Sequence, residues 1–238
     1  MEDEARILHD APLALGEGAT YFPQTDTAWW FDIVGRKLLE HRFADATTTV
    51  HDLPFMASEE DEKGKPQKYA AGAIYHVLGG EIRTLYPGLT IPNCISFTQD
   101  GRTAYFTDTK EGLLYRVATD PATGLPSGER SVVYDRRWEE GGLDGAVVGA
   151  DGVIWVAIYG GGCVEAFSPE GTRLRAIAVP AGQPTCPAFV GPAADRLMVT
   201  TASQGLDAEA LAADPHAGKT FLLDAEVKGW HAPALVIG

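Results

Sequence analysis

The stretch TQDGRTAYFTDTKEGLLYRVATD, residues 98–120, has the same plan as GADGVIWVAIYGGGCVEAFSPEG, residues 149–171. Each contains an Asp-Gly turn, an aromatic strand, a turn marked by glycine, and a second strand with an aromatic residue near its end. Residues 23–43 and 191–202 repeat the opening half of this plan. Four-stranded repeats of about 40 to 50 residues are typical of a β-propeller. The hairpins of a β-sandwich would explain the many strands, but not this recurrence.

The rest of the chain supports an all-β protein. Short segments rich in aromatic and β-branched residues alternate with Gly, Pro, Asp and Asn, which is the pattern of strands and turns. Only residues 206–218 have a helical pattern, with an acidic start and a Pro-His-Ala-Gly stop. We expect residues 5–10, ARILHD, to pair beside residues 220–226, TFLLDAE, because a propeller is commonly closed by joining its two chain ends within one blade.

One part of the repeat pattern is incomplete. The turn aspartates Asp26 and Asp100 lie too far apart for one blade and too close for two. Between them, residues 57–70 (ASEEDEKGKPQKYA) are charged and lack a strand pattern, so they are interpreted as an exposed linker. The hairpin predicted at 73–86, turning at Gly79-Gly80, has no aromatic inner pair before it. We therefore expect about five blades or an incomplete ring, whose exposed strand edges could pair with another chain.

Composition and charge narrow the function. The 238 residues, 45% of them hydrophobic, predict a single domain over 1–238 with a substantial core. A formal net charge of −14 disfavours nucleic acid as a partner. No apolar run reaches the roughly 18 residues of a membrane helix, and the acidic N-terminus is unlike a secretory signal. Three widely spaced cysteines suggest reduced thiols, so we expect a cytoplasmic protein without a membrane partner.

Several motifs in order resemble a known family. They are LALGEGATYFPQTDTAWWFDI (13–33), IPNCISFTQDGRTAYFTDT (91–109), GGLDGAVVGADGVIWVAIYGGGCVEAFSPEG (141–171) and TCPAFVGPAADRLMVTTA (185–202). The chain is similar to the regucalcin (senescence marker protein), gluconolactonase and sugar-lactone lactonase family. The resemblance implies a propeller of the six-bladed lactonase type with a divalent metal in its central channel. Here the ring would be shortened, because roughly a blade of family sequence is missing around residues 57–70.

The resemblance also implies a metal site. Carried over position by position, the ligands are Glu17, Asn93 and Asp144, each at the start of the innermost strand of a different blade. Two carboxylates and an amide carbonyl form a hard oxygen site, for which Ca²⁺ is the first expectation and Mg²⁺, Mn²⁺ or Zn²⁺ are alternatives. Taken singly, each residue would more commonly belong to a turn. The family's Pro-Asn-Gly is Pro-Asn-Cys in this chain, at Asn93-Cys94.

Three functions follow as alternatives. The first is a metal-dependent hydrolase that opens a sugar-acid lactone to the aldonic acid, with Asp144 as both ligand and catalytic base. The second is a non-catalytic, regucalcin-like metal-binding propeller, and the third is a propeller that acts as an interaction module. The family's Asn-Asp-Gly motif, which supplies substrate contacts, has no match here. In the loop DRRWEEGG (135–142), Trp138 could line the channel mouth, while Arg136 and Arg137 are either solvated or bind a polar substrate.

Overall fold

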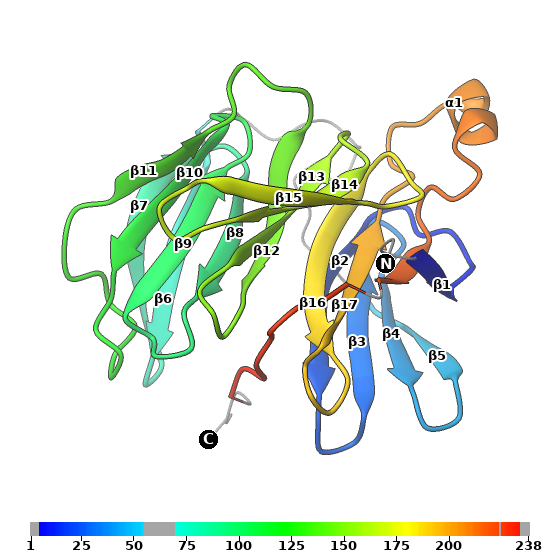
Figure 1. Ribbon diagram of the computed structural model, residues 1–238, viewed down its shortest axis with the longest axis horizontal. Coiled ribbons are helices and arrows are strands. Elements are labelled where there is room, and N and C mark those ends of the chain that lie inside the picture. Colours follow the sequence, from blue (N-terminus) through cyan, green and yellow to red (C-terminus); the bar gives the residue numbers. More distant parts are fainter. Residues whose placement is uncertain (1–4, 55–69, 224, 234–238) are drawn as a thin grey trace.

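The computed structural model describes residues 5–54, 70–223 and 225–233 (Figure 1). In this part the strands form four antiparallel four-stranded sheets and one two-stranded hairpin. Such repeated small sheets are the blades of a β-propeller, so the predicted all-β fold is confirmed. Of the predicted spacer at 57–70, residues 57–69 lie outside the described residues.

Three of the sheets are meanders of four consecutive strands. The first contains β2 (Gly16–Phe22), β3 (Thr27–Asp32), β4 (Lys37–Arg42) and β5 (Thr47–Asp52). The second contains β8 (Pro92–Phe97), β9 (Thr103–Asp108), β10 (Leu113–Ala118) and β11 (Ser131–Asp135). The third contains β12 (Gly142–Val148), β13 (Ile154–Tyr159), β14 (Cys163–Phe167) and β15 (Arg173–Ala178).

The fourth sheet joins the two ends of the chain. Its order is β16 (Pro184–Val190), β17 (Arg196–Thr201), β18 (Thr220–Leu223) and β1 (Ala5–His9). The N-terminal strand β1 runs antiparallel to β18, with Ala5 opposite Leu223 and His9 opposite Thr220. The predicted pairing of the first strand beside the last strand is thus confirmed.

A single short helix interrupts this last sheet. Helix α1 (Ala208–Ala213) lies between β17 and β18, and the side chain of Asp207 caps its first turn by accepting hydrogen bonds from the amides of Glu209 and Ala210. The helical pattern predicted at 206–218 is correct in place, but the helix is shorter because Asp214, which precedes Pro215, ends it. No helix among the described residues has the length and apolar character needed to span a membrane.

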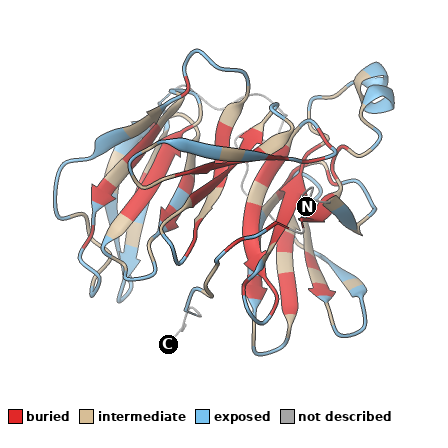
Figure 2. Ribbon diagram, in the orientation of Figure 1, coloured by how far each residue is buried: buried red, intermediate tan, exposed pale blue. Residues whose placement is uncertain are grey.

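Four inner strands lie side by side around the channel. β8 packs beside β12, β12 beside β16, and β16 beside β2. The apolar cores lie between these neighbouring sheets; Trp30 of β3, for example, is fully buried against residues of the fourth sheet such as Met198. Buried residues are concentrated on the second strands of the sheets, such as β9, β13 and β17, whereas outermost strands such as β5 and β15 are largely exposed (Figure 2).

The incomplete part of the ring is the hairpin of β6 (Gly72–Leu78) and β7 (Glu81–Leu89), which turns at Gly79-Gly80 as predicted. Both glycines have positive φ, 59° and 81°, which a two-residue hairpin turn of this kind requires. One face of the hairpin, with Ile74, packs on Phe106 and Tyr115 of the second sheet. No inner pair of strands accompanies the hairpin in the described residues, and β2 does not pack on β8 as the other inner strands pack on one another.

Candidate metal and active site

Each of the four inner strands carries a β-bulge close to its start. The register shifts between Glu17 and Thr20 in β2 and between Asn93 and Ser96 in β8. It also shifts between Leu143 and Ala146 in β12, and between residues 184 and 187 in β16. A bulge bends its strand and changes the direction of the side chains around it. The three residues implied as metal ligands therefore occur at the same structural feature in three different sheets.

Glycine has a defined role in the first of these bulges, and a cysteine takes the corresponding place in the second. Gly18 has φ 62° and Cys94 has φ 55°, in the left-handed region where only glycine is free of steric cost. Cys94 adopts this backbone at a cost of about 1 kcal/mol. Its buried thiol donates to the carbonyl oxygen of Asp144 at 2.6 Å, which links the bulges of β8 and β12.

The three implied ligands line one cavity. This cavity, of about 520 Å³, is bordered by Leu15, Glu17, Ile33, Ile91, Asn93, Thr109, Asp144, Tyr159, Gln204 and Gly205. Its polar and apolar groups come from the first three sheets and from the segment after β17. A cavity of this size with a few convergent polar groups is the usual form of a small-molecule site.

Asn93 and Asp144 are in direct contact within the cavity. The Asn93 Nδ2 atom donates to Asp144 Oδ1 at 2.6 Å, and Thr109 Oγ1 lies 3.4 Å from the same nitrogen. Thr109 in turn donates to the carbonyl oxygen of Leu143 at 2.6 Å. Asp144 is only 6% exposed, whereas Glu17 and Asn93 are half-buried. The Asp144 carboxylate is thus held in a fixed position at the cavity wall.

Burial and the negative charge of this site both raise the pKa values of two neighbouring thiols, those of Cys94 and Cys186. Burial raises the pKa of Cys94 well above its ordinary value, and the charges of Asp144 and Glu17 raise it further. Burial likewise raises the pKa of Cys186, with Glu17 and Asp144 again adding to the shift. Both carboxylates therefore act on the same two thiols, which keeps these cysteines protonated and unreactive.

The donor set fits a divalent cation that prefers oxygen. Two carboxylates that share one cavity repel each other, and a cation between them would offset that repulsion. Within residues 5–54, 70–223 and 225–233, no three His, Cys, Asp or Glu side chains cluster as metal ligands. The candidate site therefore depends on the Asn93 amide as its third donor, which favours Ca²⁺, Mg²⁺ or Mn²⁺ over Zn²⁺.

The loop before β12 differs from the sequence-based expectation. Arg136 is neither solvated nor in the cavity: it is 6% exposed and forms an ion pair with Glu165 at 2.7 Å. Its guanidinium also donates to the carbonyl oxygens of Glu140 and Gly141, so it holds the chain that leads into β12. Trp138 is 91% exposed and does not line the cavity.

Arg137 lies where the sequence predicted, whereas several residues of the cavity were not predicted. Arg137 is exposed and forms a two-pronged pair with Asp135, at 2.9 and 2.6 Å, as expected for a solvated loop residue. Sequence reasoning did not single out Thr109, Tyr159 or Gln204 as lining residues. Tyr159 is the last residue of the aromatic strand before Gly160-Gly161-Gly162, and this position is the signal that could have marked it.

The fold and the cavity together define a shortened β-propeller with an acidic, oxygen-lined site. Residues 55–203 match the family model for the SMP-30/Gluconolactonase/LRE-like region. The chain is 43% identical to the "Putative sugar lactone lactonase" of Rhizobium meliloti, with 96% of each chain covered. It is 30% identical to pentonolactonase XacC of Haloferax volcanii, covering 92% of this chain and 94% of that protein.

A solved structure is also similar. The crystal structure of the calcium-binding protein regucalcin from Agrobacterium tumefaciens superposes with a TM-score of 0.93 at 36% identity, covering 100% of this chain and 99% of that chain. The chain belongs to the SMP-30/gluconolactonase/LRE-like family. The predicted family, and with it the prediction of an enzyme of the lactonase class, is confirmed.

The comparison also bears on the incomplete ring. The alignment with the Rhizobium meliloti protein extends over 282 residues, although this chain has 238. That relative therefore contains sequence for which this chain has no counterpart, in agreement with the blade interrupted before the β6–β7 hairpin.

Proposed function

We propose that this protein is a metal-dependent hydrolase that opens a sugar-acid lactone to the corresponding aldonic acid. The observation that carries the proposal is that Glu17, Asn93 and Asp144, which come from three different sheets, line one cavity of about 520 Å³. The names of the relatives, which include lactonases of sugar and pentose lactones, support the substrate class.

Asp144 is proposed as the general base. Its carboxylate would accept a proton from a water molecule as the water oxygen attacks the lactone carbonyl carbon. The ring C–O bond then breaks, the departing alkoxide takes up a proton, and the product is the open hydroxy acid. The hydrogen bond from Asn93 at 2.6 Å orients Asp144 for this proton transfer.

Glu17, Asn93 and Asp144 would also hold one divalent ion, with Ca²⁺ as the first candidate. When bound, such an ion would polarise the lactone carbonyl and stabilise negative charge on its oxygen. The oxygen donors of the three side chains support this assignment, and so does the description of the similar Agrobacterium tumefaciens structure as a calcium-binding protein.

The rest of the cavity suits a small polyhydroxy ring. Leu15, Ile33 and Ile91 provide apolar walls that would limit the entry of bulk water. Tyr159 and Gln204 lie on the same cavity and can exchange hydrogen bonds with sugar hydroxyls. This combination favours a neutral lactone over a charged substrate, since the carboxylates would repel an anion.

Lactone hydrolysis measured after chelation, and again with Ca²⁺, Mg²⁺, Mn²⁺ or Zn²⁺ added back, tests the proposal. Five- and six-membered sugar lactones should be opened with the ion and not after its removal. Turnover that survives complete chelation would refute the metal dependence, and no turnover of any sugar lactone with any ion would refute the hydrolase.

A second candidate is a regucalcin-like protein that binds calcium without catalysis. It is favoured by the lack of the family's Asn-Asp-Gly substrate motif, which has no match in this chain. Stoichiometric metal binding without turnover would establish this alternative. The absence of both would instead support a propeller that acts as an interaction module.

A further inference from the structure

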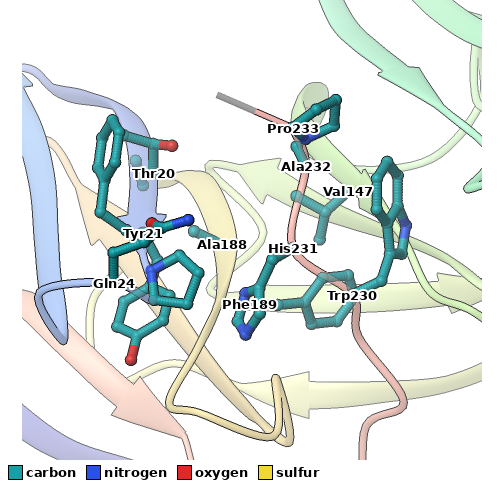
Figure 3. A pocket seen from close by; sticks show the side chains of 13 residues that line it. Thr20, Tyr21, Gln24, Val147, Ala188, Phe189, Trp230, His231, Ala232 and Pro233 are labelled. Atoms are coloured by element: carbon teal, nitrogen blue, oxygen red, sulfur yellow. The ribbon is translucent and has the colours of Figure 1, made fainter. Parts of the chain in front are cut away.

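A second cavity lies at the opposite end of the inner strands, and nothing in the proposed lactonase chemistry uses it. It has a volume of about 380 Å³ and is lined by Ala19–Gln24, Val147, Ala188, Phe189 and residues 230–233 (Figure 3). On β2, the first lining residue of this cavity, Ala19, is two residues beyond Glu17, which corresponds to about 7 Å along an extended strand. The first cavity and this one share no lining residue.

Several aromatic rings form part of the wall of this cavity. Tyr21, Phe189, Trp230 and His231 lie around it, and the rings of Tyr21 and His231 are 5.2 Å apart. The Tyr21 hydroxyl donates to Asp26 Oδ1 at 2.6 Å, so the hydroxyl is engaged outside the cavity while the ring faces it. Aromatic walls favour planar apolar ligands, which pack against ring faces and edges.

The C-terminal segment, residues 225–233, carries Trp230 and His231 and is itself fixed by hydrogen bonds to the sheets. The Trp230 indole nitrogen donates to the carbonyl oxygen of Val148 at 2.8 Å. The amide of Gly229 donates to Ala194 O at 2.9 Å, and the amide of Ala150 donates to Lys228 O at 2.7 Å. A side chain at Gly229 would lie 2.3 Å from the Phe189 ring, so only glycine permits this close approach. The cavity is therefore preorganised, which lowers the cost of binding a ligand.

The cavity lining is also electrically neutral. None of the described residues that line it is Asp, Glu, Lys or Arg, and its polar groups are those of Thr20, Gln24 and His231. A charged ligand would lose its hydration without gaining a partner of opposite charge. A neutral ring can bury its faces and still exchange one or two hydrogen bonds with the Gln24 amide or the His231 imidazole.

From this geometry we propose that the cavity beneath the C-terminal segment is a binding site for a neutral, planar aromatic molecule of one or two fused rings. The site is separate from the lactone cavity, so ligand binding here does not depend on whether the protein hydrolyses lactones.

Binding of indole, followed by ligand-observed NMR and calorimetry on the full chain, tests the proposal. Thr20 is exposed and lines the cavity, so Thr20→Trp should fill it from the rim without disturbing the core. Thr49→Trp, at an exposed position of β5 away from the cavity, is the matched control. Indole should bind saturably with one site, at least tenfold more weakly to Thr20→Trp, and within twofold of the unmodified protein to Thr49→Trp.

The same experiment can overturn the proposal. The proposal would be refuted if indole showed no saturable binding, or if it bound equally well to Thr20→Trp. Displacement of indole by an aldonic acid would also refute it, because indole would then occupy the lactone cavity. Sodium benzoate serves as a charged probe of similar size, and binding as tight as that of indole would contradict the neutral-ligand assignment.

Discussion

At the scale of single residues, Asp144 and Asp151 show how the same Asp-Gly pair can have two roles. Asp144 is buried and contacts Asn93, whereas Asp151 is exposed and accepts a turn hydrogen bond from the amide of Val153 at 3.2 Å. The sequence could not separate these environments, because both aspartates precede glycine in similar segments. The resemblance to the family marked Asp144, and its position in the cavity supports that choice.

Asp144→Asn is predicted to weaken binding of a divalent ion by at least about tenfold, because it removes one of only two carboxylates from the site. The change keeps the shape of the side chain, so the fold should be retained. Calorimetric titration with Ca²⁺ measures the effect, and Asp151→Asn is the control that should leave affinity unchanged. Equal affinities in the two variants would remove Asp144 from the metal site.

Arg136 and Arg137 are neighbours in sequence, but one is buried and the other exposed. Substituting each one tests how far a buried ion pair contributes to the free energy of unfolding compared with an exposed ion pair. Arg136→Met should lower the free energy of unfolding by about 3 kcal/mol, because among the described residues it leaves the buried Glu165 with only the partly exposed Arg173 as an ion-pair partner. Arg137→Met should leave the free energy of unfolding nearly unchanged, since the pair of Arg137 with Asp135 is exposed to solvent. Urea denaturation of both variants measures the difference. Similar losses would contradict the structural role given to Arg136.

The role of Arg136 was not predictable from its own sequence. Its partner Glu165 is 29 residues away on β14, and no sequence motif predicts that these two residues form an ion pair. A charged loop residue is usually solvated, so the pattern around Arg136 pointed the wrong way. Long-range pairs of this kind depend on how two strands are placed, which composition and periodicity do not determine.

At the scale of secondary-structure elements, local patterns were more informative. The Gly79-Gly80 pair specified the β6–β7 turn because both residues need positive φ. The usual closure of a propeller, which joins the two chain ends within one blade, predicted that β1 pairs with β18. The second cavity was not foreseen, because residues 225–233 have no regular secondary structure and are held by backbone contacts that no pattern reveals.

The folded protein is predicted to become less stable in mild acid, through His9 on the closing strand β1 and His41 on β4. Burial lowers the pKa of His9, against a smaller opposing effect of Asp10, and burial also lowers the pKa of His41. The unfolded chain therefore takes up protons at a higher pH than the folded chain does. Stability should be complete above the unfolded value of about 6.5 and decline as the pH falls through the lower folded values.

Thermal unfolding between pH 8 and pH 5 measures this effect. His9→Gln should have a smaller decline between pH 6.5 and 5 than the unmodified protein, because one of the two proton-linked groups is gone. His51→Gln, at an exposed position on β5, is the control and should keep the full decline. Parallel pH profiles for the unmodified protein and His9→Gln would contradict the role of His9.

At the scale of the whole molecule, the interrupted blade leaves apolar surface beside the ring. Tyr75, Val77 and Ile82 share one face of the β6–β7 hairpin and are 58%, 66% and 73% exposed. On β8, Ile95 and Phe97 are 52% and 41% exposed. The hairpin packs on β9 and β10 of the second sheet, but an inner pair of strands that would cover β8 is not found among the described residues. The spacing of the sequence repeats predicted this interruption. It did not predict which side chains the interruption leaves exposed.

This uncovered surface predicts concentration-dependent self-association. Adjacent exposed apolar groups, and an edge of β6 that pairs with no strand in the described part of the chain, favour contact with another chain. The net charge of −14 opposes association through long-range repulsion, so added salt should strengthen it by screening that repulsion. Sedimentation velocity over a range of protein and salt concentrations should show a larger species whose fraction increases with both concentrations.

Val77→Lys combined with Ile82→Lys should abolish that larger species without loss of thermal stability, since both side chains are exposed. The matched control is Val132→Lys combined with Leu174→Lys, which changes residues of 52% and 53% exposure on the outer strands β11 and β15. A protein that stays monomeric in high salt, or a control pair that suppresses association equally well, would show that the surface beside the hairpin is not the contact.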